Sequence, residues 1–130
     1  MLSIKSGSNR IEDVLLPVSN ENMAAIDIAI DTVKRISGKL TVMSVKGHNV
    51  TDAEALTEKV AERCRSSGID VDKYVTEGDA LDAIVGESGK YDLIIMGVEK
   101  AGGLKRILHG GLTERVVTLA SCPVTVVRDF

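Results

Sequence analysis

The chain has 130 residues, of which 44% are hydrophobic and 27% are charged, a size and balance typical of one folded domain rather than a disordered chain. Its net charge is −3, which argues against nucleic acid as a partner because nucleic-acid-binding domains usually carry a basic face. The chain has no stretch approaching the roughly 20 apolar residues of a membrane span and no secretion signal, so we expect a cytoplasmic protein with no membrane partner.

The two cysteines, Cys64 and Cys122, lie far apart and have neither a CxxC nor a Cys/His spacing. Zinc and redox sites require such spacings, so we interpret both cysteines as small, partly buried apolar residues and predict no metal site. A domain of this size buries about two-thirds of its unfolded surface and needs no crosslink to fold.

Segments of strand and helix character alternate along the chain. Residues 1–10 are polar and predict a flexible N-terminal arm, and residues 11–130 predict a single domain. Short apolar runs predict five strands, at 14–18, 40–45, 69–75, 93–96 and 124–128. Segments with helical spacing between them predict four helices, at 22–36, 51–65, 79–89 and 112–120.

Local signals place the ends of these helices. Gly38 predicts the stop of the first helix. Thr51 with Glu54 matches a capping box and predicts the start of the second, and Asp79 is expected in the first turn of the third. In the first helix, the inward face is predicted to carry four apolar residues: Met23, Ile26, Ile30 and Val33.

This alternation predicts an α/β fold with right-handed βαβ units. We expect a single doubly wound, Rossmann-like domain with a five-stranded parallel sheet of order 3-2-1-4-5 and helices on both faces. The run at 93–96 is almost purely apolar, as a central strand covered on both faces would be. Ligands of such sheets bind at the carboxyl ends of the strands, so a site is expected at the loops after strands one, two and four.

Several nucleotide folds and enzyme motifs are excluded by their missing residues. The turn after the first strand, residues 17–22, contains no glycine and so lacks the G-x-G-x-x-G of dinucleotide-binding domains. Gly97 and Gly102 have P-loop spacing, but the lysine and hydroxyl that should follow are absent. The acidic residues of a response-regulator receiver and the G-x-S-x-G of a nucleophile elbow are also absent.

A glycine-rich loop joins the fourth strand to the last helix. Residues 98–109 carry Lys100, Lys105 and Arg106 against Glu99, a local charge of 3 − 1 = +2 in an acidic chain. Glycines let backbone N–H groups converge, and a helix N-terminus attracts anions. The loop is equally compatible with a cradle for phosphate oxygens and with a surface loop whose glycines serve turns alone.

Several segments together resemble the universal stress protein family. That family has a strand ending in MG, a loop patterned G-x2-G-x9-G-[ST], a helix like V-[ST]-E-[KR]-V and a final CPV-x-VV. The matching segments here are 92–97 (DLIIMG), 112–116 (LTERV) and 122–128 (CPVTVVR). The early strand at 14–18 and the turn at 78–80 also look like the family, so the resemblance spans about residues 11–128.

The resemblance implies a site for an adenine nucleotide, ATP or AMP. Val45 would face the adenine, and Gly97, Gly110 and the residues after it would lie along the ribose and phosphates. The candidate nucleotide-binding residues are Pro17, Val18, Ser19, Val45, Met96, Gly97, Lys100, Gly110, Gly111, Leu112 and Thr113.

Three positions depart from the family pattern. Ser19 stands where an acidic residue is usual, Lys100 stands at the second glycine, and Gly111 stands at the Ser or Thr after the third glycine. Ser19 removes a charge partner for the base edge, and Gly111 removes a hydroxyl while keeping a backbone N–H. The Lys100 side chain would either fill the phosphate groove or bring its ammonium to a phosphate.

Two functions of different classes stay open. The first is a dimeric regulatory protein that binds an adenine nucleotide, with at most slow ATP hydrolysis, since no activated nucleophile, metal cluster or acid/base pair is visible. The alternative is a nucleotide-independent interaction module of the same fold. In either case, the resemblance and the apolar last strand predict a homodimer through four residues, Val124, Thr125, Val126 and Val127.

Overall fold

The structure, a computed structural model, describes residues 11–20, 23–47, 52–98 and 111–128. The predicted N-terminal arm lies outside these residues. Strands and helices alternate as the sequence predicts: β1 (Asp13–Pro17), α1 (Met23–Ile36), β2 (Lys39–Lys46), α2 (Ala53–Ser66), β3 (Asp70–Glu77), α3 (Ala80–Ser88), β4 (Leu93–Gly97), α4 (Leu112–Leu119) and β5 (Val124–Val127).

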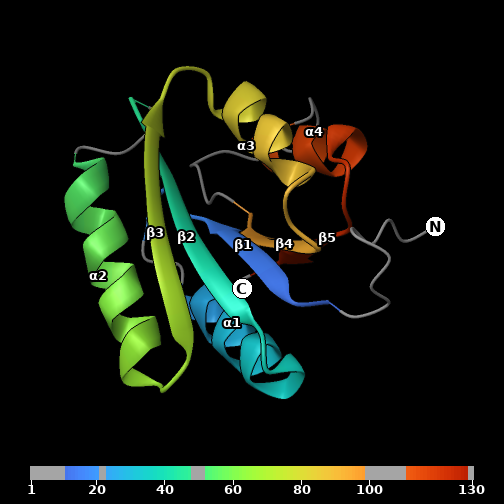
Figure 1. Ribbon diagram of the computed structural model, residues 1–130. Helices are drawn as coiled ribbons and strands as arrows, with labels where there is room; N and C mark the ends of the chain where they lie inside the picture. The colour runs from blue at the N-terminus through green and yellow to red at the C-terminus, as the bar shows by residue number, and fades with distance from the viewer. Residues whose placement is uncertain (1–10, 21–22, 48–51, 99–110, 129–130) are drawn as a thin grey trace.

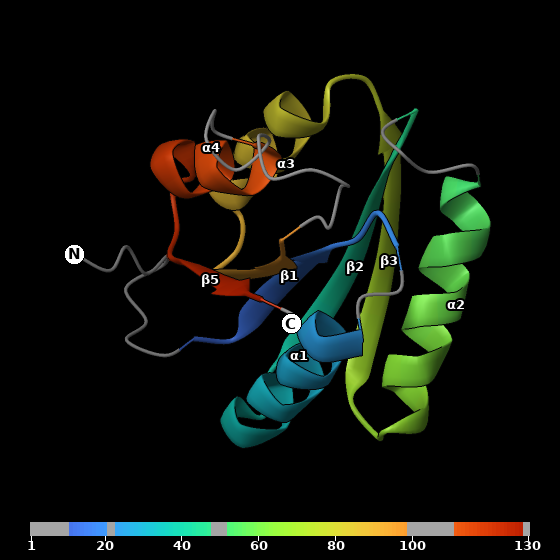
Figure 2. The same cartoon turned by 180° about the vertical axis from the view of Figure 1, so that it is seen from behind.

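The five strands form one sheet in the order β3-β2-β1-β4-β5, and every neighbouring pair is parallel. This confirms the predicted α/β fold and strand order. Helices α1 and α2 cover one face of the sheet, and α3 and α4 cover the other (Figures 1 and 2). The strand order reverses between β1 and β4, which is the point where such sheets open a crevice at their carboxyl ends.

Alternation along β1 divides the core into two layers. Val14 and Leu16 pack with α1 and α2, whereas Leu15 packs with α3 and α4, and all three are fully buried. Successive side chains of a strand point to opposite faces, so a central strand with helices on both sides must be apolar throughout. The run of apolar residues at 14–16 therefore follows from the central position of β1.

The first helix, α1, ends where predicted, but the residue in the left-handed conformation is not the predicted one. Ser37 adopts the left-handed conformation, with φ of 55°. The N–H of Ser37 donates to Lys34 O and that of Gly38 donates to Val33 O, the paired bonds of a Schellman motif. Gly38, which the sequence suggested as the stop, is instead required for packing, because a Cβ there would lie 2.4 Å from Glu12 O.

Two further local predictions are corrected. Asp52 is the N-cap of α2, and its side chain accepts from Ala55 N, so the helix does not begin with the capping box predicted at Thr51. Met23 was predicted to face inward but is 42% exposed. It is the first residue of α1, and the buried face of that helix is formed by later residues. The cap of α3 is Asp79, within the turn where the sequence placed it.

Cys64 and Cys122 are free and buried, as the sequence predicted. Burial raises the pKa of each thiol to about 11, and the nearby Asp92 carboxylate contributes at Cys122. In the described part of the chain, no group of His, Cys, Asp or Glu side chains is arranged to hold a metal ion. None of the helices described is long and apolar enough to cross a bilayer.

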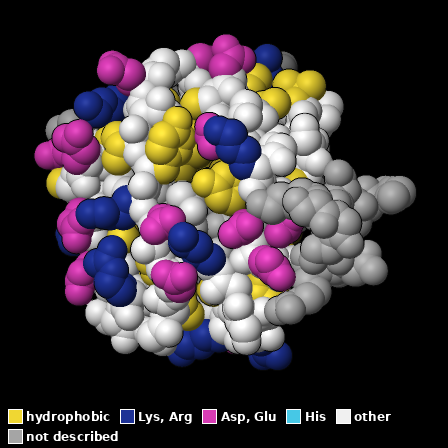
Figure 3. Space-filling view, in the orientation of Figure 1, with side chains coloured by type: hydrophobic (Ala, Val, Ile, Leu, Met, Phe, Trp, Pro, Cys, Tyr) yellow, Lys and Arg dark blue, Asp and Glu magenta, His cyan; other side chains and the backbone are white. Residues whose placement is uncertain are grey.

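Charged side chains of both signs are interleaved over the α2 and β3 side of the molecule (Figure 3). Lys73 of β3 pairs with Glu58 of α2, and Arg63 of α2 pairs with Asp27 of α1 at 2.8 Å. The pairing with Lys73 lowers the pKa of Glu58 from its usual value. These are solvent-exposed pairs of the kind that contribute little to stability.

Candidate functional site

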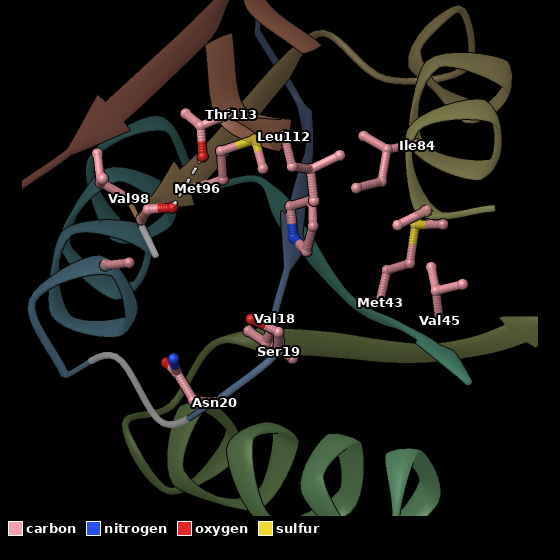
Figure 4. Close-up of a pocket in the computed structure, with 14 residues that line it drawn as sticks. Val18, Ser19, Asn20, Met43, Val45, Ile84, Met96, Val98, Leu112 and Thr113 are labelled. Atoms are coloured by element: carbon pink, nitrogen blue, oxygen red, sulfur yellow. Dashed lines mark hydrogen bonds between the residues drawn. The ribbon is translucent and has the colours of Figure 1, made fainter. Parts of the chain in front are cut away.

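A pocket opens at the carboxyl ends of the strands, where the sequence predicted a site (Figure 4). Its walls come from the segment after β1, the ends of β2 and β4, and the N-terminal parts of α1, α3 and α4. The lining residues are Pro17, Val18, Ser19, Asn20, Ala25, Met43, Val45, Ala80, Ile84, Met96, Gly97, Val98, Leu112 and Thr113.

The pocket has an apolar side and a polar rim. Met43, Val45 and Ile84 lie together on one side, and Ser19 and Asn20 lie at the rim between this side and the end of β4 (Figure 4). None of the described lining residues carries a charged side chain. The described side chains are therefore suited to the flat, weakly polar part of a ligand.

The parting of β1 from β2 leaves polar backbone groups of β2 facing the pocket. The last paired residues are Pro17 and Met43, and just beyond them Val18 N–H donates to Met43 O at 2.8 Å. In a parallel ladder alternate residues direct their polar backbone groups to the same neighbour, so Val45, two residues after Met43, directs its N–H and C=O toward β1. Because β1 turns away at Val18, these groups face the crevice.

The N-terminus of α4 lies beside the pocket. Gly111 is its N-cap, with extended backbone (φ −61°, ψ 179°) and no side-chain capping bond. Arg115 N–H makes the first bond of the helix, to Gly111 O at 3.1 Å. The N–H groups of the residues before Arg115 have no intrahelical acceptor, and with the helix dipole they favour an anion at this end.

Thr113 ties this helix to the end of β4. Its hydroxyl donates to Gly97 O at 3.2 Å (Figure 4), and the residue is 8% exposed. The bond uses the single hydroxyl hydrogen of Thr113, so toward a ligand this oxygen is left as an acceptor. The hydroxyl therefore fixes the distance between strand and helix rather than serving as a donor to phosphate.

The structure brings most of the sequence-predicted residues to this one pocket. Eight of them line it: Pro17, Val18, Ser19, Val45, Met96, Gly97, Leu112 and Thr113. Gly111 is not among the lining residues but directly precedes Leu112 as the cap of α4. Lys100 and Gly110, like His48 and His109, lie outside the described residues.

Sequence reasoning missed six lining residues: Asn20, Ala25, Met43, Ala80, Ile84 and Val98. A signal existed for Met43, which shares a face with Val45 because side chains two apart on a strand point the same way. Ala80 and Ile84 sit on the inward face of α3 and were indistinguishable from core residues, because the pocket wall and the core are the same helix face.

The fold and the crevice define a small doubly wound α/β domain whose ligand site lies at the carboxyl ends of a parallel sheet. A model of the universal stress protein family matches residues 47–128, and the chain belongs to that family.

Relatives agree with this membership. A universal stress protein of Methanocaldococcus jannaschii is 29% identical over 147 residues, an alignment covering 96% of this chain and 86% of the relative. A solved universal stress protein in complex with cAMP superposes with a TM-score of 0.78 at 19% identity, covering 92% of this chain and 98% of that one. A family protein of Arabidopsis thaliana with AMP bound superposes with a TM-score of 0.71 at 16% identity, covering 92% of each chain.

Proposed function

We propose that the pocket binds an adenine nucleotide, AMP or ATP, and that the protein is a nucleotide-dependent regulatory protein rather than a dedicated enzyme. The observation that carries this proposal is one continuous crevice with an apolar side at the end of β2 and an uncapped helix N-terminus at the end of β4. Similar proteins have been solved with cAMP and with AMP bound, which supports a nucleotide as the ligand.

The apolar side suits the base. Met43, Val45 and Ile84 offer methyl and methylene groups to a flat ring, and burial of apolar surface contributes about 25 cal/mol per Å². The N–H and C=O that Val45 directs into the crevice are a donor and an acceptor side by side. An adenine edge presents the complementary acceptor and donor, so the backbone of Val45 is placed to select it.

The other end suits phosphate. The N–H groups at the start of α4, which lack an intrahelical acceptor, and the dipole of that helix stabilise an anion by about 0.3–1 kcal/mol at an exposed site. Gly111 adds no hydroxyl, and Ser19 at the rim adds no charge. The described residues therefore supply fewer phosphate contacts than the family pattern implies, and we expect affinity in the micromolar to millimolar range.

The first experiment is calorimetric titration of the purified protein with AMP and with ATP, each with and without Mg²⁺. We expect saturable binding of at least one nucleotide. Denatured protein should also release material absorbing at 260 nm if nucleotide is retained in purification. Absence of binding by either nucleotide at millimolar concentration would sink the proposal.

A matched pair of variants assigns binding to this pocket. Thr113→Val removes the hydroxyl that ties α4 to Gly97 O, and we expect several-fold weaker binding because α4 loses its fixed distance from β4. Thr118→Val removes a hydroxyl of the same helix that bonds Glu114 O on the exposed side, and it should leave affinity unchanged. Equal effects of the two changes would place the ligand elsewhere.

The alternative function is a nucleotide-independent interaction module. The observation in its favour is that no described lining residue is charged, whereas the phosphates of phosphoryl-transfer sites are held by lysine, arginine or a metal ion. The triple variant Ser19→Asp, Lys100→Gly, Gly111→Ser restores the family pattern. If the departures weaken the site, this variant should bind AMP or ATP more tightly than the natural chain, and no gain would favour the module.

We further propose that the protein is a homodimer through β5. This strand is an edge of the sheet, and Val126 is 38% exposed. Two side chains of α4 beside it, Val117 and Leu119, are 48% and 52% exposed. An apolar edge strand with an adjoining apolar patch is a template for pairing with a second chain.

A further inference from the structure

Two hydroxyl groups are buried in the layer between β2 and α2, which is otherwise apolar. Ser44 of β2 and Thr57 of α2 are each 1% exposed, and their hydroxyl oxygens lie 2.7 Å apart. Their neighbours on the same faces are apolar: Leu40 and Val42 on the strand and Val60, Ala61 and Cys64 on the helix. Burying hydroxyl groups here is unfavourable unless each has a hydrogen-bond partner. We therefore interpret the pair as a polar link between the strand and the helix.

The partners of the pair reach the wall of the pocket. Thr57 Oγ1 lies 2.7 Å from Ala53 O, in the preceding turn of its own helix. Ser44 Oγ lies 3.4 Å from Val18 O, a long contact for a hydroxyl and a carbonyl. Thr57 has one hydroxyl hydrogen, which it donates either to Ala53 O or to Ser44 Oγ; in the second arrangement the described acceptor for the Ser44 hydrogen is Val18 O.

Val18 is the residue at which β1 leaves the sheet. Its N–H is bound to Met43 O, and its C=O is approached by the side chain of Ser44 rather than by the backbone of Val45. The two residues that follow, Ser19 and Asn20, form the polar rim of the pocket. Ser44 itself points to the opposite face of the sheet from Met43 and Val45, so it acts from behind the site without touching it.

We propose that Ser44 and Thr57 are positioning residues for the ligand pocket, a two-hydroxyl tether that fixes residues 18–20 in the wall and leaves the backbone of Val45 facing the crevice. This inference rests on the proposed nucleotide function. Thr57 orients the Ser44 hydroxyl, and Ser44 holds the Val18 carbonyl. Without the tether, residues 18–20 populate more arrangements, and the ligand must select the competent one at a cost in affinity.

Three variants separate the parts of the tether. Ser44→Ala removes the link to Val18 O, and the loss of one hydrogen bond, about 1 kcal/mol net, predicts about fivefold weaker AMP binding. Thr57→Val removes the orienting hydroxyl at nearly constant volume and should weaken binding by a smaller factor. Thr57→Ser keeps the hydroxyl and should restore the affinity of the natural chain.

Ser88 provides a matched control for simple destabilisation. It is 0% exposed, its hydroxyl donates to Val85 O at 2.6 Å, and its oxygen accepts from Ser121 N at 2.9 Å. It lies at the end of α3 that precedes β4, away from the pocket. Ser88→Ala should lower the urea midpoint while leaving AMP affinity unchanged. If Ser44→Ala weakens binding no more than Ser88→Ala does, the role of Ser44 is structural and the proposal is wrong.

Hydrogen exchange on the ligand-free protein tests the tether without any nucleotide. In Ser44→Ala, the amides of Ser19 and Asn20 should exchange several-fold faster than in the natural chain, while those of β5 should not change. Unchanged exchange at Ser19 and Asn20 overturns the tether even if AMP binds. If exchange is faster in Ser44→Ala but the natural protein binds neither AMP nor ATP, the tether exists and the proposed function is wrong. The tether would then have no role in ligand binding.

Discussion

At the scale of single residues, the ends of α1 and α2 differ in which residue takes the left-handed conformation. In α2 it is Gly68, with φ of 90°, and the cap Ser67 stays right-handed at φ −85°. In α1 it is Ser37, with φ of 55°. A non-glycine residue in this region costs about 1–2 kcal/mol, so the end of α1 carries a local strain that the end of α2 avoids.

Ser37→Gly should therefore stabilise the protein. Glycine relieves the left-handed strain but adds about 0.5–1 kcal/mol of chain entropy to the unfolded state, so we expect a net gain of about 0.5–1 kcal/mol. Urea unfolding followed by circular dichroism measures it. Ser67→Gly is the matched control and should lose stability, because Ser67 has no such strain to relieve. A gain of equal size in both variants would contradict the strain at Ser37.

The error made at this helix end from the sequence has a physical cause. Glycine at position 38 looks like the left-handed stop, because glycine is the usual residue there. The structure uses this glycine for a close approach to Glu12 O, and the left-handed position falls one residue earlier. A tertiary contact cannot be inferred from the order of residues within one turn. The error at the start of α2 is local instead, because Asp52, the residue after Thr51, caps the helix by accepting from Ala55 N.

At the scale of elements, a buried carboxylate joins the start of β1 to the start of β4. Asp92 is 2% exposed, and its Oδ2 accepts from the N–H groups of Glu12 and Asp13 at 3.0 Å each. Its own N–H donates to Asp13 O at 2.8 Å. Its Oδ1 is buried and finds no hydrogen-bond partner among the described residues. Asp92 thus extends the pairing of the two central strands ahead of their first ladder residues, Val14 and Leu93.

Asp92→Ala should cost about 2–4 kcal/mol of unfolding free energy, because two backbone N–H groups lose a charged acceptor. Asp92→Asn should cost less, since the carboxamide oxygen can still accept both bonds. Asp31→Ala is the contrasting variant, because Asp31 pairs with Arg35 on an exposed helix face and such pairs contribute under about 1 kcal/mol. Urea midpoints test all three, and a loss at Asp92 no larger than at Asp31 would refute the tie.

The helices and strands themselves were predictable because their apolar residues recur clearly at helix or strand spacing. The strand at 93–96 is apolar on both faces, and β4 is a central strand covered by helices on both faces, as that pattern predicts. The lining of the pocket was predictable near the ends of strands, as at Gly97, the last residue of β4. The part of the pocket on α3 was not predictable, because Ala80 and Ile84 belong to a helix face that contributes to both the hydrophobic core and the pocket wall.

At the scale of the whole molecule, the two edges of the sheet differ in chemistry. The edge strand β3 carries charged residues along its length, among them Asp70, Asp72 and Lys73, and Asp72 pairs with Lys39 of β2 at 2.8 Å. The other edge, β5, reads VTVV and has no charged residue. Charges on an edge strand discourage pairing with other chains, so β3 is a protected edge and β5 is an open one.

This difference predicts where two chains meet. Val126→Glu places a charge on the open edge and should convert a dimer to a monomer, because an unpaired carboxylate would be buried at the interface. Tyr74→Glu is its matched control on the protected edge, where the tyrosine is 37% exposed against 38% for Val126. Size-exclusion chromatography with light scattering at micromolar concentration should give twice the chain mass for the natural protein and for Tyr74→Glu, and the single mass for Val126→Glu. A natural protein of single mass would show that β5 does not pair, and dissociation by Tyr74→Glu alone would place the contact on β3.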